Sequence, residues 1–298
     1  MGARATARGR LTTHPVDLAT GAGLDAAFAA IGGPPAGIIN AAALSSPAAC
    51  EADPGAAAAL NVPTRLLGAL GRACRGGAPP PPFVQLSTDQ VYSGEGTPGG
   101  GWSEAAGTVA PLNAYARTKA AAEAAIRSAW PANHLILRCS VMVGALPPAW
   151  PLAPGRVPFL QFAAAAVKDA GAAAGGTSAT FYSDEWRSFV GVRDVARVCV
   201  AAIKARPPGT DVSALPSTVN MGGPARLSRA GLARAVARGL GLPPSVVREA
   251  PGAAHSAAAR VPSPADIGMD VTVLREGLGF EPRSVEEVIA GELLAVCR

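Results

Sequence analysis

The chain has 298 residues and a formal net charge of +5, and this length is sufficient to bury a substantial core in one large domain or in two lobes. Its basic residues are scattered, without a Lys/Arg-rich block or an aromatic ladder. The composition therefore excludes a dedicated nucleic-acid binder and indicates only a weak attraction to anionic ligands. No apolar stretch reaches the roughly 18 residues of a membrane span, so we expect no membrane partner.

The cysteines and histidines lack the spacing of a metal site. An odd number of cysteines without paired motifs indicates reduced thiols in a cytoplasmic protein. We therefore expect neither a disulfide framework nor a structural metal. The residues are Cys50, Cys74, Cys139, Cys199 and Cys297, with His14, His134 and His255.

Residues 1–15 contain arginines and threonines but no acid, a composition that a transit peptide can have. The Met1-Gly2 start also fits the loose myristoylation pattern. The segment is short and has no clear amphipathic pattern. We therefore favour an irregular, untargeted or artificial N-terminal segment over both alternatives.

The segment Gly21-Ala-Gly-Leu-Asp-Ala26 satisfies the Gly-x-Gly-x-x-Ala expression of dinucleotide-binding turns. Such a turn needs a buried strand directly before it. Residues 14–19 contain a proline, an acid and few apolar side chains. We interpret the match as chance.

Short apolar runs then alternate with helical patterns along the chain. The runs at 36–40, 83–88 and 135–140 predict buried parallel strands, and 56–73 and 114–129 predict helices. This alternation predicts an α/β fold with a doubly wound parallel sheet and with ligands at the carboxyl ends of its strands.

The composition changes after Gly144 to a proline-rich stretch at 145–158. Further helices are predicted to follow residues 187–194 and to begin near Ser228, which is a candidate cap, and at Ser284. We expect a cofactor domain before this change and a smaller, mainly substrate-binding lobe at 145–298, with segments that return to the main domain.

The pair Tyr115 and Lys119 carries the most chemical information. At i and i+4 of a helix the phenol and the ammonium lie on one face. A neighbouring cation favours the phenolate and lowers the tyrosine pKa from about 10 toward neutrality, where proton exchange with an alcohol or ketone is efficient. Thr88, at the end of a predicted strand, is placed to bond the same oxygen. The pair alone is also typical of a solvated helix face.

The surroundings of the pair favour catalysis. Five further segments form a recognisable series in chain order, 86–92, 111–119, 137–144, 187–194 and 220–223. With these segments, from about Val16 onward, the chain resembles the extended short-chain dehydrogenase/reductases of the NAD-dependent epimerase/dehydratase superfamily, nearest to the dTDP-4-dehydrorhamnose reductase-like branch. Gln90 stands where bacterial rhamnose-forming reductases tend to have tyrosine. Together with residues 263–270, it indicates a plant-type subgroup and leaves the sugar unassigned.

The resemblance implies a Rossmann-like fold and specific roles. Thr88 would orient and polarise the substrate carbonyl, Tyr115 would exchange the proton, and Lys119 would tune Tyr115 and contact the nicotinamide ribose. The other implied cofactor contacts are Asp17, Leu18, Asn40, Ala41, Ala42, Ala43, Asn61, Arg138, Cys139 and Ser140, and the implied substrate contacts are Asp89, Gln90 and Arg187.

Several of these residues also have local interpretations. Asp17 is a candidate helix cap, and Asn61 a cap or a buried polar residue. Cys139 is better read as a small packed residue than as a nucleophile. Arg187 fits the phosphates of a nucleotide sugar or a surface salt bridge equally well.

The family begins with a strand, a Gly-x-x-Gly-x-x-Gly turn and a helix, whose backbone amides bind the cofactor pyrophosphate. The matching region here starts at Val16-Asp17-Leu18. We therefore expect residues 16–144 to form an incomplete dinucleotide-binding domain with impaired cofactor binding. A truncated gene model is the favoured explanation, over a shortened isoform or a protein that no longer holds the dinucleotide well.

The functional hypothesis is an NADP(H)- or NAD(H)-dependent oxidoreductase or epimerase-type enzyme that acts on a nucleotide sugar or a similar carbonyl metabolite. A homodimer is compatible with it. The alternative is a non-catalytic regulatory subunit of a partner enzyme, resembling the β-subunit of methionine adenosyltransferase. That subunit shares the fold and keeps a Tyr-x-x-x-Lys pair, so the pair cannot separate the two hypotheses.

Overall fold

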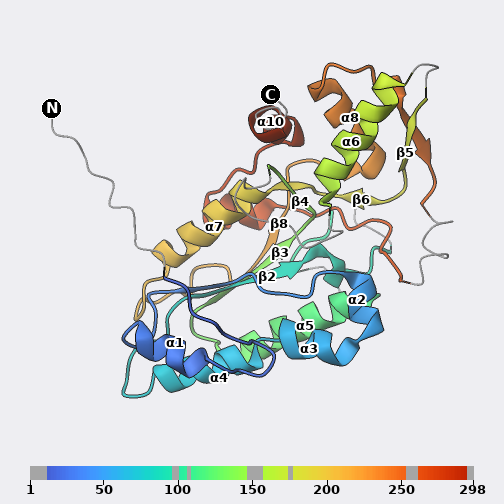
Figure 1. The fold of residues 1–298 in the computed structure, drawn as a ribbon. Coiled ribbons are helices and arrows are strands. Elements are labelled where there is room, and N and C mark those ends of the chain that lie inside the picture. The colour runs from blue at the N-terminus through green and yellow to red at the C-terminus, as the bar shows by residue number, and fades with distance from the viewer. Residues whose placement is uncertain are drawn as a thin grey trace.

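The computed structural model describes residues 12–95, 101–105, 109–145, 157–173, 177–252 and 261–293. Its centre is a parallel sheet with strand order β1-β2-β3-β8 (Figure 1). The two central strands are almost entirely buried, as expected where helices cover both faces. The strands are β1 (Ile38–Asn40), β2 (Phe83–Thr88), β3 (His134–Cys139) and β8 (Thr218–Met221).

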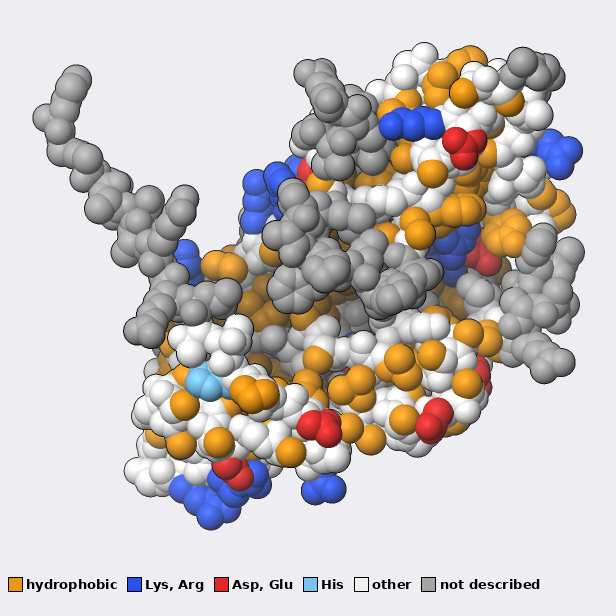
Figure 2. Space-filling model, viewed as in Figure 1, with side chains coloured by type: hydrophobic (Ala, Val, Ile, Leu, Met, Phe, Trp, Pro, Cys, Tyr) orange, Lys and Arg blue, Asp and Glu red, His pale blue; other side chains and the backbone are white. Residues whose placement is uncertain are grey.

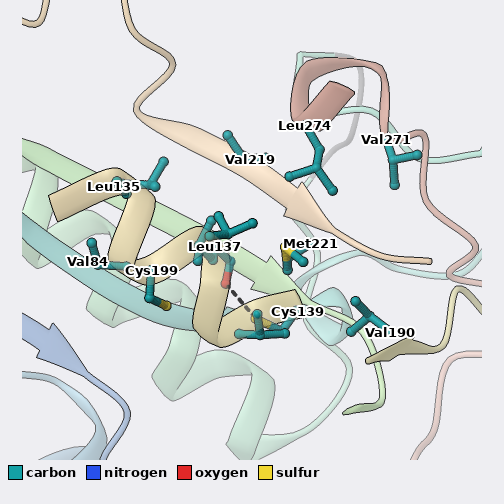
Figure 3. Close-up of a cluster of buried hydrophobic side chains, with 13 residues drawn as sticks. Val84, Leu135, Leu137, Cys139, Val190, Cys199, Val219, Met221, Val271 and Leu274 are labelled. Atoms are coloured by element: carbon teal, nitrogen blue, oxygen red, sulfur yellow. Dashed lines mark hydrogen bonds between the residues drawn. The ribbon is translucent and has the colours of Figure 1, made fainter. Parts of the chain in front are cut away.

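Helices cover the sheet on two sides, which gives the predicted doubly wound α/β arrangement (Figure 1). On one side, helices α1 (Leu24–Ala30), α4 (Thr64–Ala73) and α5 (Ala114–Ala129) share an apolar cluster with Phe83 of β2. On the other side, α7 (Val192–Ala205) packs on Leu135, Leu137 and Cys139 of β3 (Figure 3). The helices α2 (Pro47–Ala52) and α3 (Pro54–Asn61) lie beside α5.

A second layer contains α6 (Phe159–Ala172) and α8 (Arg229–Gly239), which pack on the parallel pair β5 and β10. Phe159 lies at its centre, stacked on Phe189 with ring centroids 6.1 Å apart. The remaining elements are β4 (Met142–Val143), β5 (Ala179–Tyr182), β6 (Trp186–Arg187), β7 (Val190–Gly191), β9 (Leu227–Ser228), β10 (Val247–Ala250), α10 (Val285–Val288) and the short turns η1 (Asp89–Val91), η2 (Pro244–Val246), η3 (Val273–Gly277) and η4 (Ile289–Leu293).

One predicted helix is divided in the structure. The sequence pattern predicts a single helix over 56–73, but α3 ends at Asn61 and α4 begins at Thr64. Pro63 lies between them, and a proline lacks the amide hydrogen that would continue the helix. The predicted cap Ser228 is confirmed, since its hydroxyl accepts a hydrogen bond from the amide of Gly231 at 3.0 Å.

The glycine-rich segment near the N-terminus is the turn that starts α1. Within the described part of the chain, no strand precedes this helix, as the interpretation of a chance match requires. Gly23 has φ 81°, and a Cβ atom there would lie 2.4 Å from the carbonyl oxygen of Pro15. The chain's own turn therefore accounts for this glycine.

A buried polar network ties α5 to the sheet. Glu123 of α5 and Arg138 of β3 form a bidentate pair, Nε to Oε1 at 3.1 Å and Nη2 to Oε2 at 2.8 Å, and are 1% and 3% exposed. Ser87 donates to Glu123 at 2.6 Å, and Arg138 donates to the Tyr92 hydroxyl at 3.0 Å. Burial raises the pKa of Glu123, but Arg138 outweighs it and brings the pKa below its ordinary value.

A close approach of two chain segments explains a glycine after β8. A Cβ atom on Gly223 would lie 2.0 Å from the carbonyl oxygen of Phe189. We expect Gly223→Ala to lower the free energy of unfolding by about 1–3 kcal/mol, because the backbone must shift. The matched control is Gly71→Ala in α4, where a Cβ atom meets nothing within 4 Å and should stabilise the helix by up to about 1 kcal/mol. Urea unfolding measures both, and equal effects would contradict this packing.

We expect Glu123→Gln to cost about 3–5 kcal/mol of unfolding free energy, because it leaves a buried arginine without its counter-charge. Glu286→Gln is the control, since its carboxylate pairs with Arg238 on the surface and should change stability by less than about 1 kcal/mol. The pKa of Glu123 is lowered, so its stabilisation is present above the unfolded pKa and is lost as pH falls through the folded value. The difference between wild type and variant should therefore shrink in acid, and a constant difference would argue against the ion pair.

Candidate active site

The three catalytic residues predicted from the sequence come from the carboxyl end of β2 and from the start of α5. Thr88 ends β2 and is in register with Cys139, which ends β3. Tyr115 lies in the first turn of α5, which starts after the cap Asn113. The ammonium nitrogen of Lys119 lies 5.9 Å from the centre of the Tyr115 ring. The predicted helix and the common face of the pair are confirmed.

Lys119 is buried between α5 and β2. Its side chain is 3% exposed, and Nζ donates to the carbonyl oxygen of Leu86 at 2.9 Å. Burial lowers the pKa of Lys119 to about 8, because the charged form loses its hydration. The lysine therefore keeps its charge at neutral pH and gives it up in mild alkali.

Tyr115 differs from the prediction. Burial raises its pKa above the ordinary value, and the hydrogen bond with Thr88 only partly offsets this. Asp89 adds to the increase through its charge. The predicted lowering of this pKa is therefore wrong for the site as the structure describes it, since the loss of hydration of the phenolate is the largest influence on it. At neutral pH Tyr115 is a proton donor.

Thr88 links the tyrosine to a buried acid. Its hydroxyl lies close enough to Tyr115 to influence the pKa of the phenol, and it donates to Oδ1 of Asp89 at 3.2 Å. Ser140 donates to the other oxygen of Asp89 at 2.8 Å. Burial raises the pKa of Asp89, while the charge of Arg187 opposes the shift. Tyr115, Thr88, Asp89 and Ser140 thus form one connected group.

Arg187 is an internal residue. It is 2% exposed, so the interpretation as a surface salt bridge is wrong. Its Nη2 donates to Ser263 Oγ at 3.1 Å and to the Pro264 carbonyl at 2.8 Å. These bonds hold the segment at 263–265 against β6, and the charge of the guanidinium acts on Asp89.

Two asparagines shape the loop that follows β1. Asn40 donates to Gln85 at 2.8 Å and accepts from the amide of Ala42 at 3.3 Å. Asn61 is fully buried, with Oδ1 accepting from the Leu44 amide at 2.7 Å and Nδ2 donating to Thr118 Oγ1 at 2.9 Å. Asn61 therefore positions the loop at 41–44 against α5 rather than touching a ligand. These contacts agree with the interpretation of Asn61 as a buried polar residue.

Two predicted contacts on β3 point elsewhere. Arg138 uses its three guanidinium nitrogens on Glu123 and Tyr92, so it has no free face for the nicotinamide, contrary to expectation. Cys139 packs in the core with Val190 and Met221 (Figure 3). Burial raises the pKa of its thiol, which suits a packed residue and not a nucleophile.

The predicted adenine contacts belong to a separate turn. Asp17 is exposed and accepts from the Ala19 amide and the Thr20 hydroxyl, each at 2.8 Å. The hydroxyl of Thr20 lowers the pKa of Asp17. Leu18 packs with the cluster of α1 and α4. Asp17 therefore caps a local turn, which is close to its alternative interpretation as a helix cap.

Two supports of the site, Glu51 and Glu123, were missed in the sequence. Glu51 of α2 accepts from the Ala114 amide at 2.6 Å and so satisfies the first turn of α5. Gln90, which was predicted as a substrate contact, accepts from Asn113 at 2.9 Å and ties η1 to the same helix end. Glu123 had a usable signal, because it is an acid four residues after Lys119 on the same helix face.

The surface charges, the potential metal ligands and the helix lengths of the described residues bear on other classes of function. On the face viewed in Figure 2, lysines and arginines occur in separate groups rather than in one basic patch. Among the described residues, no group of three or more His, Cys, Asp or Glu side chains could hold a metal ion. In the same part of the chain, no helix has the length and apolar character needed to cross a membrane.

Several solved structures have a similar fold. The dTDP-4-dehydrorhamnose reductase of Clostridium acetobutylicum superposes with a TM-score of 0.72 at 19% identity and covers 95% of this chain and 88% of its own. The Bacillus anthracis enzyme in complex with NADP gives 0.73 at 17% identity, covering 94% and 86%. DesIV, a dTDP-glucose 4,6-dehydratase from Streptomyces venezuelae with NAD bound, gives 0.64 at 20% identity, covering 91% and 76%.

These similarities show a Rossmann-like α/β fold. A comparison with curated protein sequences gives no match. The model of the RmlD substrate binding domain matches residues 3–296. The chain therefore belongs to the RmlD substrate binding domain family.

Proposed function

We propose that this protein is an NAD(P)-dependent oxidoreductase or epimerase-type enzyme that acts on a carbonyl or hydroxyl of a nucleotide sugar or a similar metabolite. One observation carries the proposal. The hydroxyls of Tyr115 and Thr88 lie close together at the carboxyl edge of a parallel sheet, with the Lys119 amine beside the tyrosine ring. In α/β sheets this edge is where ligands bind.

The residues suit proton transfer to a carbonyl oxygen. A bound dinucleotide would supply the hydride, and the exposed loop at Ala41 together with Lys119 is available to hold it. Tyr115, neutral because its pKa is raised, would donate its proton to the substrate oxygen while Thr88 orients that oxygen. The charge of Lys119 would stabilise the phenolate that remains after transfer.

The proposal assigns different roles to the two parts of the chain. Residues 16–144 contribute the sheet edge, Tyr115 and Lys119 and would hold the dinucleotide. Residues 145–298 would mainly form the substrate lobe, with β8 returning to the central sheet. The identity of the sugar and the choice between NADP(H) and NAD(H) are open to direct assay.

We expect Tyr115→Phe to lower kcat/KM about 10²- to 10⁴-fold, because it removes the proton donor and keeps the ring. Thermal unfolding should change little. Tyr182→Phe in β5, a strand of the second layer, is the matched control and should keep activity. The assay follows NADPH oxidation with a panel of 4-keto sugar nucleotides. Unchanged turnover in Tyr115→Phe would remove this mechanism.

We expect NADPH to bind more weakly than roughly 1 μM, the tight end of the usual range for enzyme ligands. The reason is that Gly21–Ala26 forms a turn of the chain itself, with no strand before it in the described residues. A fluorescence titration with NADPH and NADH measures this. Lys119→Met should lose binding and Lys204→Met, at the exposed end of α7, should not. Tight binding, or equal binding by both variants, would contradict this view of the site.

The alternative is a non-catalytic regulatory subunit that resembles the β-subunit of methionine adenosyltransferase. The observation in its favour is the raised pKa of Tyr115, which makes the phenolate hard to reach. Absence of turnover on every sugar nucleotide, together with co-purification of a synthetase, would support it. Turnover that depends on Tyr115 would exclude it.

A further inference from the structure

Helix α7 has an apolar stripe on its outer side. The helix lies across the sheet from α1 and α4 (Figure 1), and its inner side packs on β3. The stripe contains the residues at i, i+4, i+8 and i+11, a spacing that puts them on one helix face. Its two valines are 39% and 49% exposed, and a row of exposed apolar side chains indicates an interaction surface. The residues are Val192, Ala196, Val200 and Ile203.

The stripe continues onto the open edge of the sheet. Ile203 lies against Gly37, directly before β1, where a Cβ atom would be 2.6 Å from Cδ1 of Ile203. Ile38 packs on the cluster of α1 and α4, and successive side chains of a strand point to opposite faces. Ile39 therefore lies on the α7 side, and it is 44% exposed. The stripe and Ile39 together are called the α7–β1 surface.

Ile39 also has open backbone groups. β1 is the edge strand of the sheet, and the amide of Ile38 donates to the carbonyl of Pro82 at 2.8 Å. In a parallel ladder the next residue points its N–H and C=O in the opposite direction, here away from β2. No strand of the described residues pairs with this side of β1. Another polypeptide that comes alongside can bond such groups.

A row of cations flanks the stripe. Arg193 and Arg197 have side chains that are 64% and 63% exposed, and Lys204 on the same side of the helix is exposed too. The only acid of α7, Asp194, is fully buried. The buried acids near the two arginines also pair with Arg283, at 2.9 Å each. Positive charge therefore remains on the solvent side of α7.

These features discriminate between three kinds of occupant. A second copy of the chain, packed stripe to stripe about a two-fold axis, would bring two cation rows to one rim, where like charges repel. An anionic membrane would attract the cations, but lipid tails cannot bond the backbone groups of Ile39. A polypeptide with acidic side chains complements both the charge and the open edge.

We propose that the α7–β1 surface docks an amphipathic helix of a partner protein, with its apolar side on the stripe and its acidic residues opposite the cation row. An extended stretch of the same partner would pair with Ile39. A helix laid on an apolar groove and a strand added to a sheet edge are both common modes of recognition. Tyr115 belongs to α5 on the other face of the sheet, so this inference does not depend on the proposed catalytic function.

The first test is fluorescence anisotropy of the full chain with a labelled synthetic helix of about 18 residues, long enough to span α7. The probe has leucines along one side and glutamates on its flanks. We expect saturable binding, and at least about 10-fold weaker binding by the same peptide with lysines in place of the glutamates. No preference for the acidic peptide would overturn the proposal.

The same assay locates the contact with two variants. Val200→Asp should weaken binding of the acidic peptide by about 10-fold or more, because it puts a charge into the stripe. The matched control Ala201→Asp adds the same charge at the next exposed position of the helix, outside the stripe, and should weaken binding by less than about 3-fold. Equal losses in both variants would contradict the proposed contact.

The second test uses the methyl resonances of the wild-type protein and needs no binding variant. The acidic peptide should shift the methyl signals of Ile39, Val192 and Val200. Val109, which is 42% exposed outside this surface, is the internal control and should not shift. Shifts at Val109 without shifts in the stripe would place the peptide elsewhere and refute the docking site.

Two measurements address the other occupants. Sedimentation velocity should give the same oligomeric state for the wild type and Val200→Asp, and a dimer that dissociates in this variant would assign the surface to a second copy. Flotation with vesicles of equimolar phosphatidylserine and phosphatidylcholine should leave the protein unbound. Vesicle binding that is lost in Val200→Asp would assign the surface to a membrane. Either result would overturn the proposal of a partner helix.

Discussion

The ion pair between Glu123 and Arg138 decides where the candidate site lies. It joins the third turn of α5 to the middle sheet strand, buried from water on both partners. A bidentate pair fixes both distance and rotation, so the helix cannot turn about its axis without breaking it. On α5, Lys119 lies one turn before Glu123, and Tyr115 lies two turns before Glu123. The rotation that pairs the acid is therefore the one that brings the phenol and the amine to the sheet edge.

Further contacts fix the start of the same helix. Asn113 caps it, Glu51 accepts from the Ala114 amide, and Asn61 bonds Thr118. Asn113 and Glu51 satisfy amide groups that a helix leaves unpaired, and Asn61 holds the first turns from a different part of the chain through the Thr118 hydroxyl. The tyrosine is thus held at a helix start that has little freedom to fray. Such support keeps catalytic groups within the tolerance that proton transfer requires.

The sequence was a good guide wherever local pattern decides the outcome. The apolar runs of β2 and β3 and the spacing of Tyr115 and Lys119 sufficed for the sheet and for the common helix face. It failed where the outcome depends on partners distant in the chain. Arg138 looked available to a cofactor because nothing local reveals that Glu123 consumes it.

Arg187 and Tyr115 show the same limit in electrostatic terms. A pKa reflects the balance between charges and lost hydration, and burial cannot be read from a five-residue motif. The motif contained the amine but not the surrounding Thr88, Asp89 and Cys139. The break at Pro63 is a different case, because its signal was present and was outweighed by the apolar pattern on either side.

The loss of hydration at Lys119 and Tyr115 also affects the folding equilibrium in alkali. Between pH 8 and 10.5 the unfolded chain binds a proton that the folded Lys119 has already released, so alkali favours the native state in this interval. Tyr115 has the opposite effect above its ordinary value of 10, where the unfolded phenol ionises and the buried one does not. As pH rises, Lys119 and Tyr115 thus shift the folding equilibrium in opposite directions. Their combined contribution to the free energy of unfolding is greatest in moderately basic solution.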